Sequence, residues 1–70
     1  MEILAERLRL LRKEKGLRQE DMQEHLGISY NSYCRYEKGE RDPNAPTIVI
    51  MADFFGVSAD YLLGRTDKRT

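Results

Sequence analysis

Two side chains with paired hydrogen-bonding groups, Asn31 and Arg35, stand four residues apart in the segment YNSYCRYEK. On a helix this spacing places both side chains on one face. An asparagine amide donates and accepts, and an arginine guanidinium donates in a flat fork, so each can form two parallel bonds with a planar partner. The edges of DNA bases are such partners, and we hypothesise that Arg35 reads a guanine and Asn31 an adenine.

The helix that carries these residues is predicted from about Tyr30 to Glu37. Ser29 can accept a hydrogen bond from an amide of its first turn, and Gly39 closes it. The tyrosines recur at helical spacing, so at least one of them should be part of the core. If Tyr33 and Tyr36 face inward, the outer face holds the candidates for contact with a groove: Tyr30, Asn31, Cys34, Arg35 and Lys38.

A second helix, predicted from Gln19 to Leu26, comes directly before this one. Gly27 suits the left-handed conformation that ends a helix, and only Ile28 separates it from Ser29. A helix, a turn of three residues and a second helix form a helix-turn-helix, whose second helix lies in the major groove of DNA.

The remaining elements are also predicted to be helices. Leucines at positions 4, 8 and 11 indicate an amphipathic helix over 3–15. Asn44 is a candidate cap, with Pro46 tolerated in the first turn, before a fourth helix at 48–55, and Ser58 caps a fifth at 59–63. We therefore expect an all-α fold of five helices, with a domain over 1–64 and a polar tail or truncated linker over 65–70.

Composition sets limits on function. The chain has 70 residues, 12 basic and 12 acidic, and a net charge of zero, so affinity for nucleic acid would depend on local charge. The single cysteine allows no internal disulfide, which fits the cytoplasm, and we expect neither a signal peptide nor a membrane span. Without paired carboxylates, an activated nucleophile, a metal cluster or a phosphate loop, we expect no enzyme and no cofactor.

Four stretches of the sequence carry a resemblance to a known family: ERLRLLRKEKGLRQEDM, LGIS, RYEKGERDP and MADFFGVSADYLLG. In this order and spacing they are similar to the phage repressor and Cro-like (XRE-type) helix-turn-helix family, over roughly Leu4 to Gly64. The resemblance implies a five-helix bundle of the lambda-repressor-like type. It also implies sequence-specific binding of an operator in double-stranded DNA by a transcriptional regulator, with a repressor expected, encoded by a bacterium or phage and acting at the nucleoid.

The resemblance also implies residue roles. Base-reading positions are Tyr30, Asn31, Cys34 and Arg35, with Tyr30 on a thymine methyl or a phosphate. Phosphate contacts are expected at Arg18, Gln19, Ser32, Lys38 and Arg41. Arg12 and Glu37 match a buried ion pair that joins the first and third helices.

Several positions depart from the family pattern. Gln23 stands where alanine is usual and Tyr33 where isoleucine or valine is usual. If the two hydrogen-bond, their polar atoms are satisfied; if they do not, the angle between the second and third helices shifts, and the base contacts inferred from relatives shift with it. Arg18 stands where a capping side chain is common. Ile50 and Phe54 form an apolar stripe that is either additional core or a homodimer surface.

One such module reads few base pairs, so a homodimer is expected at least on DNA, and a C-terminal effector domain or partner protein is possible. The alternative function is a protein-interaction module, such as an antitoxin, that binds its partner through the fourth helix.

Overall fold

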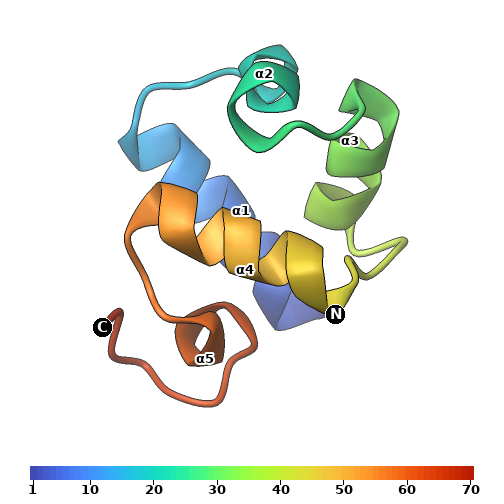
Figure 1. Ribbon diagram of the computed structural model, residues 1–70. Helices are drawn as coiled ribbons and strands as arrows, with labels where there is room; N and C mark the ends of the chain where they lie inside the picture. Colours follow the sequence, from blue (N-terminus) through green and yellow to red (C-terminus); the bar gives the residue numbers. More distant parts are fainter.

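The computed structural model describes residues 1–70 and contains five α-helices, one short 3₁₀ helix and no strand. The elements are α1 (Glu2–Glu14), η1 (Gln19–Asp21), α2 (Met22–Leu26), α3 (Tyr30–Lys38), α4 (Ala45–Phe55) and α5 (Ala59–Leu62). In Figure 1, α2 and α3 form one end of the bundle, α5 lies at the opposite end, and α4 runs between them. The predicted all-helical class is confirmed, and none of the helices combines the length and apolar character that crossing a bilayer requires.

Most predicted helix ends lie within one residue of the observed ones, and α4 differs most. It begins at Ala45 rather than Ile48, because Asn44 Oδ1 accepts a hydrogen bond from Thr47 N at 2.9 Å. Pro46 fits this first turn since its missing N–H would have had no helical partner there. The candidate caps Ser29 and Ser58 likewise accept bonds from the first turns of α3 and α5.

The predicted second helix is divided into η1 and α2. As expected from the sequence, Arg18 offers no side-chain cap. Asp21, three residues further on, supplies the bond instead, and its Oδ2 accepts from Arg18 N at 2.8 Å. The carboxylate of Asp21 therefore closes this first turn, where a hydroxyl side chain at position 18 would commonly cap it.

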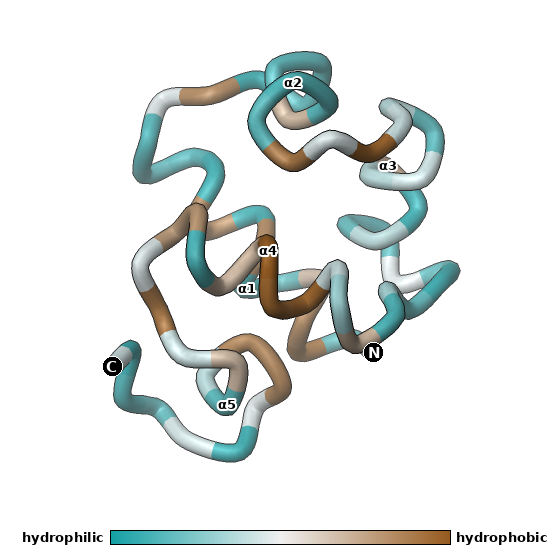
Figure 2. The backbone as a smooth tube through the Cα atoms, in the orientation of Figure 1, coloured by the Kyte–Doolittle hydropathy of each residue, from teal (hydrophilic) through white to brown (hydrophobic).

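The core lies where α1, α2, α3, α4 and α5 meet. Its buried members come from all five helices: Leu4, Leu8, Leu11, Met22, Leu26, Tyr33, Tyr36, Met51, Ala52, Phe55, Tyr61 and Leu62. The prediction that at least one of the three spaced tyrosines is part of the core is confirmed, since Tyr33 and Tyr36 are buried. Figure 2 shows α4 as one of the most hydrophobic segments of the chain.

The turn between α2 and α3 is short. Gly27 has φ of +68°, a conformation that side chains disfavour, and its amide donates to Gln23 O at 2.9 Å. Ile28 packs partly buried against the core. The turn is therefore held to the bundle, and α3 leaves it in a set direction.

Residues 65–70, expected as a polar tail, lie against α1 and α5. Arg7 of α1 donates to Thr66 O at 2.8 Å and to Asp67 at 2.9 Å. Arg69 donates twice to Glu14, at 2.8 and 2.7 Å, and this contact lowers the pKa of Glu14. Local sequence patterns do not predict these contacts, because the partners are more than fifty residues apart along the chain.

Candidate nucleic-acid interface

The outer face of α3 presents Asn31 and Arg35 to solvent, as the helical spacing predicted. Neither side chain forms a hydrogen bond or an ion pair within the chain. Both groups therefore keep all their donors and acceptors available, which a base-reading pair requires.

Tyr30 and Cys34 lie on the same side of α3. Tyr30 is 41% exposed and Cys34 is half-buried. A hydrogen bond with Cys34 raises the pKa of the Tyr30 hydroxyl above its usual value. The hydroxyl of the exposed Tyr30 can donate to an acceptor outside the chain.

Two exposed cations, Lys38 and Arg41, stand at the C-terminal end of α3 and just beyond it. Neither has an acidic partner, and the Arg41 guanidinium lies 5.8 Å from the centre of the Tyr36 ring. Like Arg35, they could meet a phosphate without first breaking an ion pair.

The other expected phosphate contacts have partners within the chain or are partly covered. Arg18 bonds to Asp21 and also lies 3.2 Å from Glu20, and the arginine lowers the pKa of Asp21. Gln19 Nε2 donates to Glu37 Oε1 at 3.1 Å, and Ser32 is half-buried. A phosphate contact by Arg18 or Gln19 would compete with these bonds, and these roles stay predictions.

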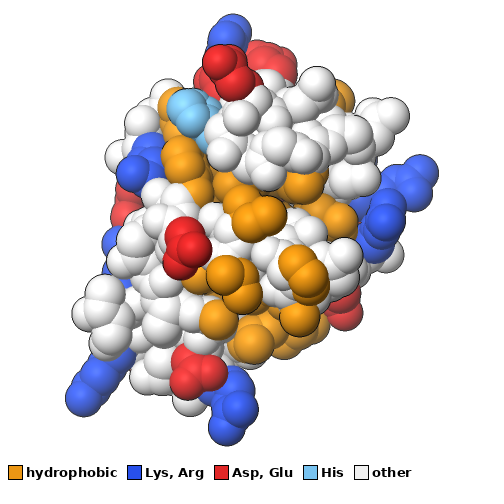
Figure 3. Space-filling model, viewed as in Figure 1, with side chains coloured by type: hydrophobic (Ala, Val, Ile, Leu, Met, Phe, Trp, Pro, Cys, Tyr) orange, Lys and Arg blue, Asp and Glu red, His pale blue; other side chains and the backbone are white.

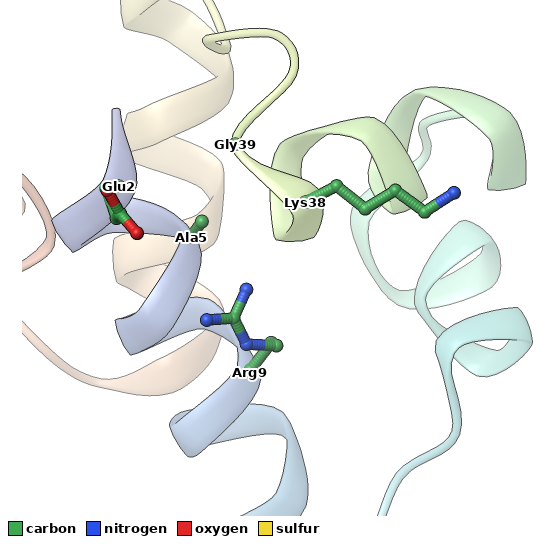
Figure 4. Close-up of a pocket in the computed structure, with 5 residues that line it drawn as sticks. All are labelled: Glu2, Ala5, Arg9, Lys38 and Gly39. Atoms are coloured by element: carbon green, nitrogen blue, oxygen red, sulfur yellow. The ribbon is translucent and has the colours of Figure 1, made fainter.

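A pocket of about 260 Å³ lies beside the end of α3, lined by Glu2, Ala5, Arg9, Lys38 and Gly39. Figure 4 shows the Arg9 side chain between α1 and α3, whereas Lys38 points away from the pocket. Pockets for small molecules are larger, about 300 to 1,000 Å³, and mostly apolar. Its size and polar lining do not indicate a small-molecule site.

Glu37, on the inner face of α3, is the one buried acidic residue and is 2% exposed. Arg12 of α1 donates to both carboxylate oxygens, from Nε at 2.6 Å and from Nη2 at 3.2 Å. Arg12 also donates to Leu17 O at 2.8 Å. Together with the Gln19 bond, these contacts join α1, the segment before α2 and the end of α3 around one carboxylate.

Arg9 adds a contact that the sequence analysis missed. Its guanidinium donates to the backbone carbonyl of Glu37, near the C-terminus of α3, where carbonyls lack helical partners. Its position one turn before Arg12 on α1 was a usable signal. Two arginines of α1 thus hold the last turn of α3, one through the side chain of Glu37 and one through its backbone.

Of the two alternatives for Gln23 and Tyr33, the structure shows the one without a hydrogen bond between them. Gln23 Oε1 accepts from Tyr30 N at 3.1 Å, because the amide reaches across the turn rather than into the core. The Tyr33 hydroxyl is buried without a hydrogen-bond partner of good geometry. Burial, followed by the nearby Glu37 carboxylate, raises the pKa of Tyr33 far above its usual range.

We expect Tyr33→Phe to leave the domain as stable or to stabilise it by up to about 1 kcal/mol, because it removes a buried polar group that lacks a partner. Thermal melting followed by circular dichroism measures the change, with Tyr36→Phe as the matched control. A Tyr33→Phe variant that melts more than about 5 °C below wild type would show that the hydroxyl makes a stabilising bond.

The apolar stripe expected at Ile50 and Phe54 needs correction. Phe54 is partly buried against the core, and its ring lies 4.9 Å from the ring of His25. The exposed apolar residues of α4 are Val49 and Ile50, at 52% and 45%. We call these two residues the α4 patch, and Figure 3 shows hydrophobic side chains gathered across the middle of this face.

The family comparison matches most of the chain. The family described as "Helix-turn-helix" matches residues 8–62. The chain is 44% identical over 63 residues to the uncharacterized HTH-type transcriptional regulator YobD of Bacillus subtilis, covering 90% of this chain and 56% of that protein. It is 36% identical over 65 residues to the cryptic phage CTXphi transcriptional repressor RstR of Vibrio cholerae, covering 93% of this chain and 59% of that protein. The chain thus spans about half the length of the curated relatives it matches first.

Solved structures of a phage repressor have a similar fold. The solution structure of the DNA-binding domain of the P22 c2 repressor superposes with a TM-score of 0.79 at 30% identity, covering 86% of this chain and 79% of that one. The P22 c2 repressor in complex with a synthetic operator superposes with a TM-score of 0.79 at 29% identity, covering 84% of this chain and 89% of that one. The expected lambda-repressor-like bundle is confirmed by this similarity.

Proposed function

Since the chain belongs to the helix-turn-helix family of phage repressor and Cro-like (XRE-type) domains, we propose that it binds double-stranded DNA as a transcriptional regulator. The observation that carries the proposal is the exposed face of α3, where Asn31 and Arg35 have no partner within the chain. The buried Glu37 network supports it, because it holds this helix to the rest of the bundle.

In this proposal α3 enters the major groove and its outer face meets the bases. Arg35 donates two bonds to a guanine, Asn31 pairs with an adenine, and Tyr30 and Cys34 contact the neighbouring bases or a phosphate. Lys38 and Arg41 hold the DNA backbone, with Arg18, Gln19 and Ser32 as further backbone contacts. Phosphate contacts set the register of the helix, and base contacts set the preferred sequence.

We expect the domain to repress transcription by binding an operator that overlaps a promoter. This operator would lie in bacterial or phage DNA, in the cytoplasm. We propose a binding role rather than an enzymatic one because the similar proteins YobD and RstR are named as a transcriptional regulator and a transcriptional repressor. Selection of bound duplexes from a random pool tests the proposal. An enriched motif supports it, and a wild-type domain that enriches no sequence and binds no duplex at low salt contradicts it.

The α4 patch favours a homodimer on DNA. A single module reads few base pairs, so two copies on half-sites about 34 Å apart would supply the affinity. Exposed apolar side chains on one helix can form a self-complementary contact between two copies related by a twofold axis. A C-terminal effector domain or a separate partner protein would add to this assembly.

We expect the double variant Val49→Glu, Ile50→Glu to remain folded and to lose cooperative binding to a duplex with two half-sites, because four carboxylates would meet at the twofold axis. Light scattering and binding titrations measure the effect, with Asp53→Ser on the same helix as control. Unchanged cooperativity in the double variant would contradict the homodimer surface.

The same patch favours a second candidate function, a protein-interaction module such as an antitoxin that binds a partner through α4. In that case wild type stays a monomer in light scattering, both free and on DNA. A complex of two copies with one duplex supports the homodimer instead.

A further inference from the structure

A side-chain hydrogen bond connects α2 to the first residue of α3. Gln23 Oε1 accepts from the Tyr30 amide at 3.1 Å. Gln23 lies on the exposed side of α2, and its Nε2 has no partner within the chain. The bond spans seven positions and closes the turn at Gly27 on its solvent side.

The two sides of the helix pair are held in different ways. On the inner side, Met22 and Leu26 of α2 and Tyr33 of α3 are packed in the core. On the outer side, Gln23 is the residue of α2 whose side chain bonds to α3. Core packing permits small rotations about the contact, and a polar bond at the opposite edge restricts them.

The bond lies next to the residues proposed to read bases. The first amides of a helix have no helical partner, so the Tyr30 amide would otherwise need water. Ser29 Oγ satisfies the Ser32 amide at 3.1 Å from within the turn, whereas the Tyr30 amide depends on α2. Asn31 is the next residue along the helix, so movement of this turn would displace its side chain.

We propose that Gln23 is a positioning residue for the first turn of α3, an inference that rests on the proposed function. By holding this turn, Gln23 sets how sharply the domain discriminates between DNA sequences. Paired hydrogen bonds to a base edge tolerate little misplacement, because they weaken steeply with angle and distance. Phosphate contacts by flexible side chains tolerate more. Loss of the bond should therefore reduce selectivity more than it reduces overall affinity.

Two substitutions distinguish loss of the hydrogen bond from a change in the side chain alone. Gln23→Ala removes the acceptor, whereas Gln23→Glu keeps an acceptor, and a carboxylate is favoured at the N-terminus of a helix. We expect Gln23→Ala to lower the affinity ratio between the selected duplex and a scrambled duplex about tenfold, with little change in melting temperature. Gln23→Glu should preserve the ratio even if repulsion of phosphates weakens binding to both duplexes. Glu24→Ala, an exposed change on the same helix, is the control.

Hydrogen exchange of the Tyr30 amide, followed by NMR, tests the bond without DNA. Exchange should be slow in wild type and Gln23→Glu and about tenfold faster in Gln23→Ala. If wild type selects DNA and Gln23→Ala keeps the full ratio, or Gln23→Glu loses it, the positioning role is overturned. If wild type selects no DNA, the proposed function fails and the selectivity role fails with it, whereas the exchange result still measures the bond.

Discussion

Replacing Glu37 with alanine should lower the free energy of unfolding by about 3 to 5 kcal/mol, because it leaves the buried side of Arg12 without its carboxylate. Gln19 would lose its acceptor at the same time. In a domain of this size, a loss of 1 kcal/mol lowers the melting temperature by about 4 to 8 °C. Calorimetry or circular dichroism would measure a fall well above 10 °C, ahead of any change in base preference.

Two further variants identify the cause. Glu40→Ala removes an exposed carboxylate close in sequence and should change the melting temperature little. The double variant Arg12→Met, Glu37→Met removes both charges and should be less destabilised than Glu37→Ala, because no buried charge is left alone. A Glu37→Ala variant as stable as wild type would contradict the role of the ion pair in joining α1 to α3.

Arg35→Ala should weaken binding to the selected duplex about 5- to 150-fold, the range for loss of 1 to 3 kcal/mol of base discrimination. Arg35 has no partner within the chain, so its removal should leave the fold intact. On a duplex in which the contacted guanine is replaced, wild type and variant should bind with similar affinity. Titrations of both duplexes with both proteins measure the difference.

Lys38→Ala is the matched control, because a lost phosphate contact weakens binding to every sequence by the same factor and reduces the salt dependence. If Arg35→Ala also weakens binding equally on every duplex, Arg35 contacts a phosphate. If it changes nothing, Arg35 lies outside the interface.

The parts of this structure that depend on local sequence could be predicted. Ser29, Asn44 and Ser58 each accept a bond from an amide three residues ahead, so the helix starts follow from chemistry within one turn. The spacing of Tyr33 and Tyr36 was sufficient to place them in the core.

The parts that depend on how helices meet could not be predicted. Gln23 bonds across a turn, and its acceptor role follows from the angle between α2 and α3. Phe54 lies one turn from exposed Ile50, yet it is partly buried because His25 of α2 and Lys15 pack against its ring. The ion pair between Arg69 and Glu14 could be predicted only from the positions of both chain segments in space.

The internal pairing of arginines has a consequence for how the domain would respond to ionic strength. Arg7, Arg12, Arg18 and Arg69 are matched with acidic side chains of the same chain. Each phosphate neutralised by a protein cation releases condensed counterions, and this release drives binding to DNA of any sequence. Four of the twelve basic side chains are already neutralised within the chain, so these four contribute counterion release only if they leave their carboxylates. Binding to DNA should therefore weaken less steeply with added salt than twelve basic residues alone would predict.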